Sequence, residues 1–195
     1  WKNSWSIWVY PAEESADFGE VVLAETVDAA LDELSEGGTV LLAPDPSTLK
    51  GEPGKFVPVF WSPVFSPDEA GTMGVLCNPE DPALALFPTD MHSDWQWWNL
   101  AVHSKALVLD GLSPDIRPIV EAVDNFVMNR RLAYIFEAEC ESGRLLVCSM
   151  DISSDEARLR PEVRALLASL LDYMNSPAFN PSGRLKAGEL KSFLN

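Results

Sequence analysis

Basic residues are scarce in this chain of 195 residues. Lysine and arginine together number 14 against 30 aspartates and glutamates, so the formal net charge is −16. Such a surface repels phosphate backbones and anionic membrane headgroups, and nucleic acid is therefore not an expected partner. Neutral ligands such as sugars, which are bound by hydrogen bonds and aromatic stacking, remain compatible with this charge.

Long apolar runs are also absent. No run approaches the roughly 20 residues that a membrane-spanning helix requires, so membrane insertion is not expected. The first five residues contain neither an initiator methionine nor the pattern of a signal peptide. We therefore expect the sequence to be cut from a larger multidomain protein.

Histidine and cysteine are too few and too scattered for a metal site. The two histidines are His92 and His103, and the three cysteines are Cys77, Cys140 and Cys148. They form no Cys-x-x-Cys pair and no Cys/His cluster with the spacing of a zinc site. The sequence predicts three buried thiols, no metal and no cofactor.

The sequence has the composition of a globular domain, and its first quarter has the pattern of a β-α-β unit. Hydrophobic residues make up 47% of the chain. A strand is predicted over residues 21–24, a helix from an N-cap at Thr26 to the glycines at 37 and 38, and a wholly apolar strand over 39–43. Continuous apolar strands are typical of sheets covered by helices on both faces, so we expect the centre of the sheet to be parallel.

The remaining pattern completes a single α/β domain over residues 1–195. Further strands are predicted over 5–10, 73–77, 106–109 and 118–123, a hairpin over 132–139 and 145–150, and helices over 82–87, 161–174 and 185–194. Residues 1–12 are expected to form an interdomain linker or first strand, and residues 176–195 a C-terminal tail.

Tryptophan is abundant, with seven residues in the chain. Trp95 and Trp98 stand three positions apart, so a helix places them on one face while Trp97 points elsewhere. One face can belong to the core, and the other must meet a partner. We expect a neighbouring domain there; the alternative is an aromatic platform for a sugar ring, with polar neighbours as hydrogen-bonding groups. The candidate contact residues are Trp61, His92, Asp94, Trp95, Gln96, Trp97, Trp98 and Asn99.

Cys77 is the leading candidate for a catalytic residue, because it ends a predicted buried strand. A nucleophile elbow needs small neighbours that tolerate a strained turn, and Leu76, Asn78 and Pro79 do not supply them. Any partner base would have to be one of the two histidines, and neither lies in a recognisable motif. A Cys-dependent hydrolase or transferase is kept as an alternative.

Three glutamates alternate near the end of the predicted hairpin strand, at Glu137, Glu139 and Glu141. Paired carboxylates can serve glycoside hydrolysis when suitably separated. Three beside a turn are more typical of a solvated strand face that blocks edge pairing, and we favour that interpretation.

Four stretches are informative together: FVPVFWSP at 56–63, MGVLC at 73–77, FPTDMHSDWQWW at 87–98 and VDNFVMNRRL at 123–132. They resemble the C-terminal domain of large gut-bacterial proteins of glycoside hydrolase family 2, which are β-galactosidase-like or sugar-binding. The likeness runs from about residue 5 to residue 174, and its most specific element is the segment 92–98. The resemblance implies a class I glutamine amidotransferase-like fold, which is α/β, three-layered and flavodoxin-like, with a mostly parallel central sheet and a C-terminal β-hairpin.

The resemblance also implies a function. In that family the catalytic carboxylates belong to an upstream TIM barrel, so no catalytic residue is carried over to this chain. We expect a non-catalytic accessory domain of a carbohydrate-active hydrolase that packs on the other domains of its parent and helps to bind a galactoside or another glycan. The alternatives are an independent carbohydrate-binding module and a Cys77-dependent hydrolase or amidotransferase-like enzyme. Through the parent, a periplasmic or extracellular location is expected.

Overall fold

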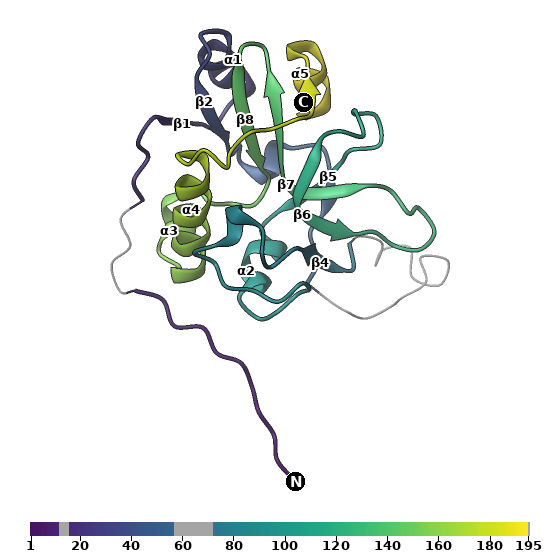
Figure 1. The fold of residues 1–195 in the computed structure, drawn as a ribbon. Helices are drawn as coiled ribbons and strands as arrows, with labels where there is room; N and C mark the ends of the chain where they lie inside the picture. The colour runs from purple at the N-terminus through teal and green to yellow at the C-terminus, as the bar shows by residue number, and fades with distance from the viewer. Residues whose placement is uncertain (12–15, 57–71, 195) are drawn as a thin grey trace.

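Nine strands form one mixed sheet in the computed structural model, which describes residues 1–11, 16–56 and 72–194 (Figure 1). The strands are β1 (Val21–Ala24), β2 (Thr39–Leu42), β3 (Glu52–Pro53), β4 (Gly74–Cys77), β5 (Lys105–Val108), β6 (Arg117–Val123), β7 (Leu132–Cys140), β8 (Gly143–Cys148) and β9 (Arg184–Leu185). The main order across the sheet is β1-β2-β8-β7-β5-β3. In addition, β6 pairs with β4 and β7, and β9 pairs with β7.

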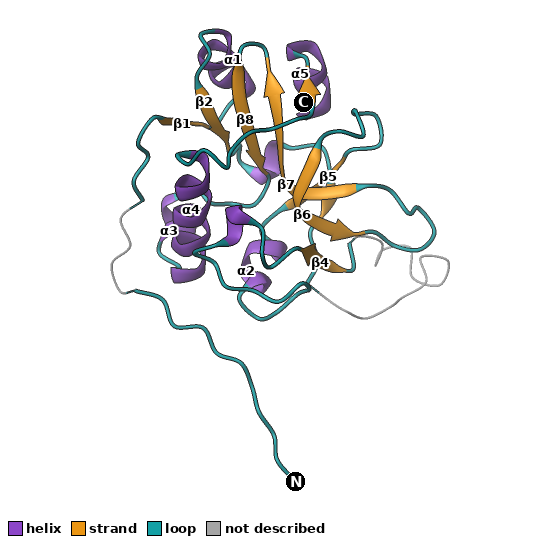
Figure 2. Ribbon diagram, in the orientation of Figure 1, coloured by secondary structure: helices purple, strands orange, loops and turns teal. Residues whose placement is uncertain are grey.

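Helices pack against both faces of this sheet (Figure 2). They are α1 (Val27–Ser35), α2 (Trp97–Val102), α3 (Asp155–Arg158), α4 (Pro161–Met174) and α5 (Ala187–Leu194), with single turns η1 (Pro46–Thr48) and η3 (Pro82–Leu84). Val40 and Leu42 of β2 pack in one cluster with Leu34 of α1, whereas Leu41 joins a second cluster with Leu166 of α4. Every residue of β2 is buried because its two faces meet different helices.

The prediction of a flavodoxin-like, mostly parallel three-layer fold is wrong. Among the described strands, three pairings are parallel and five are antiparallel. The reason lies in the connections, because a parallel crossover needs about a dozen residues or more. Only residues 141–142 separate β7 from β8, and only 124–131 separate β6 from β7, so both connections force antiparallel pairing. The result is a largely β, mixed sheet.

Predictions that rest on local signals are confirmed. The side chain of Thr26 accepts a hydrogen bond from the Ala29 amide at 3.3 Å, and α1 ends before Gly37, whose φ of +89° suits glycine. Strands β1 and β2 flank α1 and run parallel, as the β-α-β pattern indicated. Helix α4 occupies the residues that its apolar stripe predicted.

The two ends of the chain behave differently. Residues 5–10 do not form the strand that their residue types favour: they extend away from the sheet and leave Trp5, Ile7 and Val9 exposed (Figure 1). Residues 176–194 lie against the body, where β9 pairs with β7 and Leu190 of α5 is fully buried.

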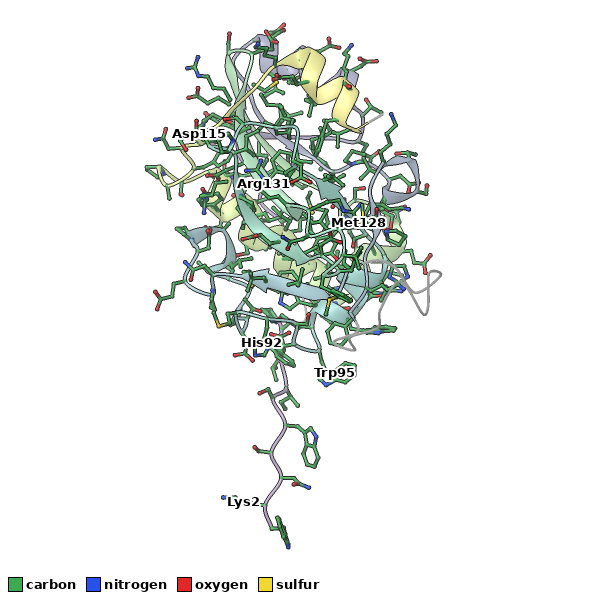
Figure 3. The ribbon with its side chains drawn as sticks, turned by 90° about the vertical axis from the view of Figure 1, so that its right-hand side faces the viewer. Lys2, His92, Trp95, Asp115, Met128 and Arg131 are labelled. Atoms are coloured by element: carbon green, nitrogen blue, oxygen red, sulfur yellow. The ribbon has the colours of Figure 1, made fainter. Side chains whose placement is uncertain are left out.

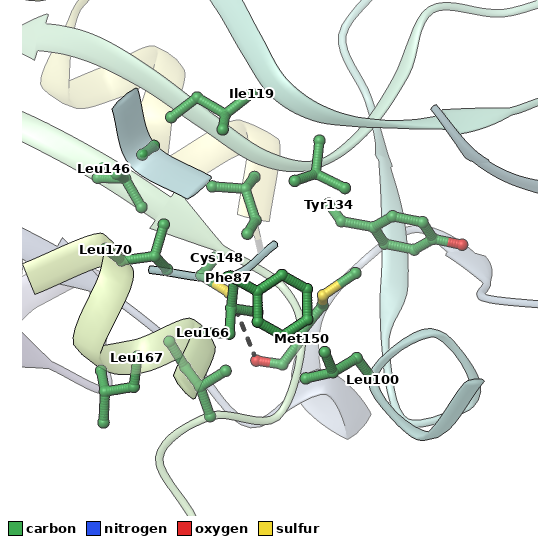
Figure 4. Close-up of a cluster of buried hydrophobic side chains, with 14 of the residues drawn as sticks. Phe87, Leu100, Ile119, Tyr134, Leu146, Cys148, Met150, Leu166, Leu167 and Leu170 are labelled. Atoms are coloured by element: carbon green, nitrogen blue, oxygen red, sulfur yellow. Dashed lines mark hydrogen bonds between the residues drawn. The ribbon is translucent and has the colours of Figure 1, made fainter. Parts of the chain in front are cut away.

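The three cysteines are buried and free, as predicted. Cys148 lies in the core cluster beneath α4, with Phe87 and Leu166 among its neighbours (Figure 4). Its thiol donates to the Met150 carbonyl oxygen at 3.7 Å, and burial raises its pKa to about 12.

Candidate functional site

The turn before α2 is held by the buried carboxylate of Asp94. Its Oδ1 accepts a hydrogen bond from the backbone N–H of Gln96 at 3.1 Å. Its Oδ2 accepts from the Thr89 hydroxyl at 3.1 Å and from the Asp90 amide at 3.2 Å. Asp94 therefore caps the turn that leads into α2.

Gln96 ties the same turn to the N-terminal segment. Its side-chain nitrogen, Nε2, donates to the Pro88 carbonyl at 2.8 Å and to Asp94 Oδ2 at 3.1 Å. Its side-chain oxygen, Oε1, accepts from the Tyr10 hydroxyl. Trp8 donates from its indole nitrogen to the same Pro88 carbonyl at 3.2 Å. The hydrogen bonds of Asp94 and Gln96 are thus made inside the protein, and these side chains are not presented to a ligand.

The three tryptophans of this segment have different environments. Trp97 is fully buried, donates from its indole nitrogen to the Thr89 hydroxyl at 2.7 Å, and packs edge-on against Phe87. By contrast, Trp95 is 70% exposed and Trp98 is 49% exposed. The predicted division, with Trp97 on one side and Trp95 and Trp98 on the other, agrees with these exposures.

Trp95 marks the end of the molecule from which the N-terminal segment extends (Figure 3). Its ring lies 5.2 Å from that of Phe56. We call Phe56, Trp95 and Trp98 the aromatic surface. His92 is exposed near the same end, and Asn99 is buried in α2. The structure does not bring them together as a polar rim for this surface, and Trp61 lies outside the described residues.

Cys77 is poorly placed to act as a nucleophile. It is buried at the end of β4, and its thiol donates to the Asp90 carbonyl oxygen at 3.4 Å. Burial raises its pKa to about 11; a hydrogen bond with Thr89 opposes this shift, and the charges of Asp94 and Asp81 add to it. Little thiolate exists at neutral pH under these conditions. The hydrogen bonds of His92 and His103 go to backbone carbonyls and not to this thiol.

An ionic cluster that no local sequence pattern predicted joins β6, β7 and α4, with buried carboxylates and a partly exposed arginine. Arg117 Nε donates to Glu137 Oε1 at 2.9 Å, and a second guanidinium nitrogen bonds to Asp81. Tyr173 donates to Glu137 Oε2 at 2.6 Å and accepts from Arg117 at 3.1 Å. Burial acts to lower the pKa of Arg117, and the two carboxylates raise it by more.

Glu137 is therefore not part of a solvated strand face, and that interpretation is wrong for this residue. It is buried on β7 opposite Arg117 of β6, whereas Glu139 pairs at the surface with Arg184 at 2.8 Å. The continuous apolar residues on both sides of Glu137 were the available signal, because a buried carboxylate needs a charged partner on an adjoining strand.

One family profile, described as Domain of unknown function (DUF8487), matches residues 21–195. The chain belongs to this family. No protein with curated annotation matches the sequence. The DUF8487 match begins with β1, so Trp8 and Tyr10, which anchor the N-terminal segment, lie outside it.

The described residues offer neither a metal cluster nor a membrane helix. Across residues 1–11, 16–56 and 72–194, no three side chains from His, Cys, Asp and Glu are grouped so that they could hold a metal ion. None of the helices there has the length and apolar character needed to span a bilayer.

Proposed function

We propose that this DUF8487 domain is a non-catalytic accessory domain of a carbohydrate-active, β-galactosidase-like hydrolase, and that it packs on a neighbouring domain through the aromatic surface. The observation that carries the proposal is the exposure of Trp95, on the turn that buried hydrogen bonds hold in place, and of Trp98, in the first turn of α2. The kind of parent rests on the residues that resemble glycoside hydrolase family 2. Its periplasmic or extracellular location is part of the same proposal.

The energetics favour a partner over permanent exposure. Removing a large apolar side chain from water is worth about 1.5–3 kcal/mol, and aromatic residues dominate the energetics of interfaces. A rigid turn adds to this, because less conformational freedom is lost when the partner binds. Trp95 and Trp98 therefore have the properties of interface anchors.

The N-terminal segment extends the same surface. Trp8 and Tyr10 are bonded to the body through Pro88 and Gln96. The residues between and before them, Trp5, Ile7 and Val9, alternate with these anchors and are exposed. An extended segment with one anchored and one apolar face suits a second contact with the same neighbouring domain.

The polar groups favour packing over sugar binding. A sugar site needs hydrogen-bonding side chains that converge on a ring beside an aromatic platform. Asp94 and Gln96 direct theirs into the protein. Carbohydrate binding is nevertheless a second candidate, because the exposed indoles of Trp95 and Trp98, three positions apart in the chain, are suited to stacking on sugars.

The test uses the Trp95→Ala/Trp98→Ala double variant in the full-length parent and in this chain alone. We expect the chain alone to keep its unfolding free energy within about 1 kcal/mol per substitution, since both side chains are half exposed or more. In the parent, calorimetry should show a lower melting temperature for the transition that includes this domain. Deleting the whole domain should destabilise or aggregate the parent.

The matched control is Leu159→Ala, which removes an apolar side chain that is 78% exposed after α3. It should leave the parent unchanged. A parent whose melting temperature is insensitive to the double variant contradicts packing. If the isolated chain binds a β-galactoside saturably and the double variant abolishes that binding, the surface is a carbohydrate-binding site and not a packing surface.

A further inference from the structure

A crevice opens at the carboxyl ends of β1, β2 and β8. These three strands are parallel, so Ala24, Leu42 and Cys148 end at the same edge of the sheet (Figure 1). The segments that follow them contribute residues 25–27, 44–46, 48–49, 151 and 153–154 to the walls of a cavity of about 610 Å³. That volume lies within the range of small-molecule sites.

The topology explains why the crevice is there. After β1 the chain enters α1, which packs on one face of the sheet, and after β8 it enters α3 and α4, which pack on the other. Where successive connections leave a parallel sheet toward opposite faces, the loops diverge and leave a hollow at the strand ends. Ligands of open sheets bind at such points.

The lining fixes the sign of the ligand charge. It contains three carboxylates, Glu25, Asp45 and Asp151, together with hydroxyl groups, and no lysine, arginine or histidine among the described residues. None of the three carboxylates has an ion-pair partner in the described part of the chain. The N-terminus of α1 contributes the equivalent of about half a positive charge, which three carboxylates outweigh.

Two of the carboxylates are held in place. Asp45 accepts from the Ser47 amide at 2.8 Å, and this backbone hydrogen bond lowers its pKa, so the group stays ionised. Asp151 accepts from the amide and the hydroxyl of Ser154 at 3.1 and 2.7 Å. The negative charge therefore sits at defined positions on separate loops.

The size and walls of the cavity point to an organic cation. The carboxylates are not grouped as metal ligands in the described structure, and the space between them exceeds that of a single ion. Leu49 and Leu194 supply apolar walls. We propose that the crevice binds a small aliphatic diamine or polyamine, whose ammonium groups pair with Glu25, Asp45 and Asp151 while its methylene chain lies on the leucines.

The experiment must separate this site from diffuse attraction, since a net charge of −16 draws cations to the whole surface. The probes are putrescine and spermidine, titrated into the chain by calorimetry and by amide chemical shifts, with 1,4-butanediol as the uncharged analogue. The test variant is Glu25→Gln/Asp45→Asn, in which the asparagine oxygen can still accept from Ser47. The control is Glu33→Gln/Glu36→Gln, which removes two exposed charges outside the crevice.

We expect saturable binding of spermidine, with shifts centred on residues 25–27, 44–49 and 151–154. The test variant should weaken binding by at least about tenfold, as expected when charged partners are lost, and the control should change it little. The diol should not bind. Equal weakening in both variants, or shifts spread over the whole surface, would overturn the proposal, as would the absence of saturable binding.

Discussion

In one half of the sheet, β1, β2 and β8 run parallel and have helices on both faces, so all of β2 is buried. In the other half, β4 and β6 are antiparallel, and among the described helices α2 packs on one face. Leu76 and Val123 are exposed on the other face. The comparison shows that the helices packed on a strand determine which of its side chains remain exposed to a partner. The parallel half leaves a polar crevice at its strand ends, and the antiparallel half leaves apolar and aromatic side chains at the surface.

The largest loss of stability is expected for Trp97→Ala, in the antiparallel half of the sheet. Its indole is fully buried beneath the surface on which Trp98 is exposed. Truncation of a buried tryptophan should lower the free energy of unfolding by about 3–5 kcal/mol, whereas Trp98→Ala should change it by less than about 1 kcal/mol. Urea denaturation of both variants measures the difference, and equal losses would contradict the assigned burial.

Arg117→Ala tests the ionic cluster that connects β6, β7 and α4. The substitution leaves Glu137 buried without its cation, for which a loss of about 3–5 kcal/mol is typical. Because the side chain of Arg117 is 41% exposed, we expect the lower end of that range, about 3 kcal/mol. Tyr173→Phe removes one hydrogen bond of the same cluster and should cost about 1 kcal/mol. A Tyr173→Phe variant less stable than Arg117→Ala would show that the cation is not the dominant partner.

The loop after β6, in the antiparallel half, should make the stability of the protein depend on pH through Asp124. Burial raises the pKa of Asp124, but hydrogen bonds from the Arg130 side chain and amide lower it by more, so the net pKa is below its usual value. A depressed carboxyl pKa gives stability that is present above the unfolded pKa, near about 4, and is lost as the pH falls through the folded value.

The Asp124→Asn variant should therefore be less stable than the wild type by about 1–2 kcal/mol at neutral pH. The difference should narrow below about pH 4, where the Asp124 carboxyl of the unfolded wild-type chain begins to be protonated while that of the folded chain is still ionised. Denaturation at a series of pH values measures it. A stability difference between the two proteins that grows as the pH falls would contradict the lowered pKa of Asp124.

The smallest effect is expected at the helix cap of the parallel half. Thr26→Ala removes the hydrogen bond to Ala29 and should lower the free energy of unfolding by about 1 kcal/mol, while Thr26→Ser should keep most of it. Thermal denaturation of the pair checks this. Equal behaviour of the two variants would show that the hydroxyl does not stabilise α1.

The sequence was informative wherever a structure depends on neighbours in the chain. The cap at Thr26, the apolar stripe of α4 and the separation of Trp97 from Trp95 and Trp98 depend on neighbouring residues and were predicted. The direction of the strands depends on which segments pair; the antiparallel hairpin of β7 and β8 was predicted, but parallel pairing was wrongly extended from β1 and β2 to most of the other strands. The short connection between β6 and β7 could have corrected it.

Other features could not be obtained from local patterns. The crevice exists only because β8 lies beside β2, with about a hundred residues between them in the chain. The bond from Tyr10 to Gln96 and the cluster around Arg117 likewise join distant segments. Helix periodicity assigned Trp97 to a different face from its neighbours, but the position of the sheet decided which face is inside.

The burial of the three thiols has a consequence for the recovery of the protein after unfolding. While the chain is folded, Cys77, Cys140 and Cys148 are shielded from oxidants, and their raised pKa values keep them protonated. Unfolding releases all three together with ordinary reactivity, and any disulfide formed then joins residues that are unpaired in the native fold. In an oxidising compartment such a crosslink would turn a reversible opening into a permanent loss, so the lifetime of the protein there depends on how rarely it unfolds.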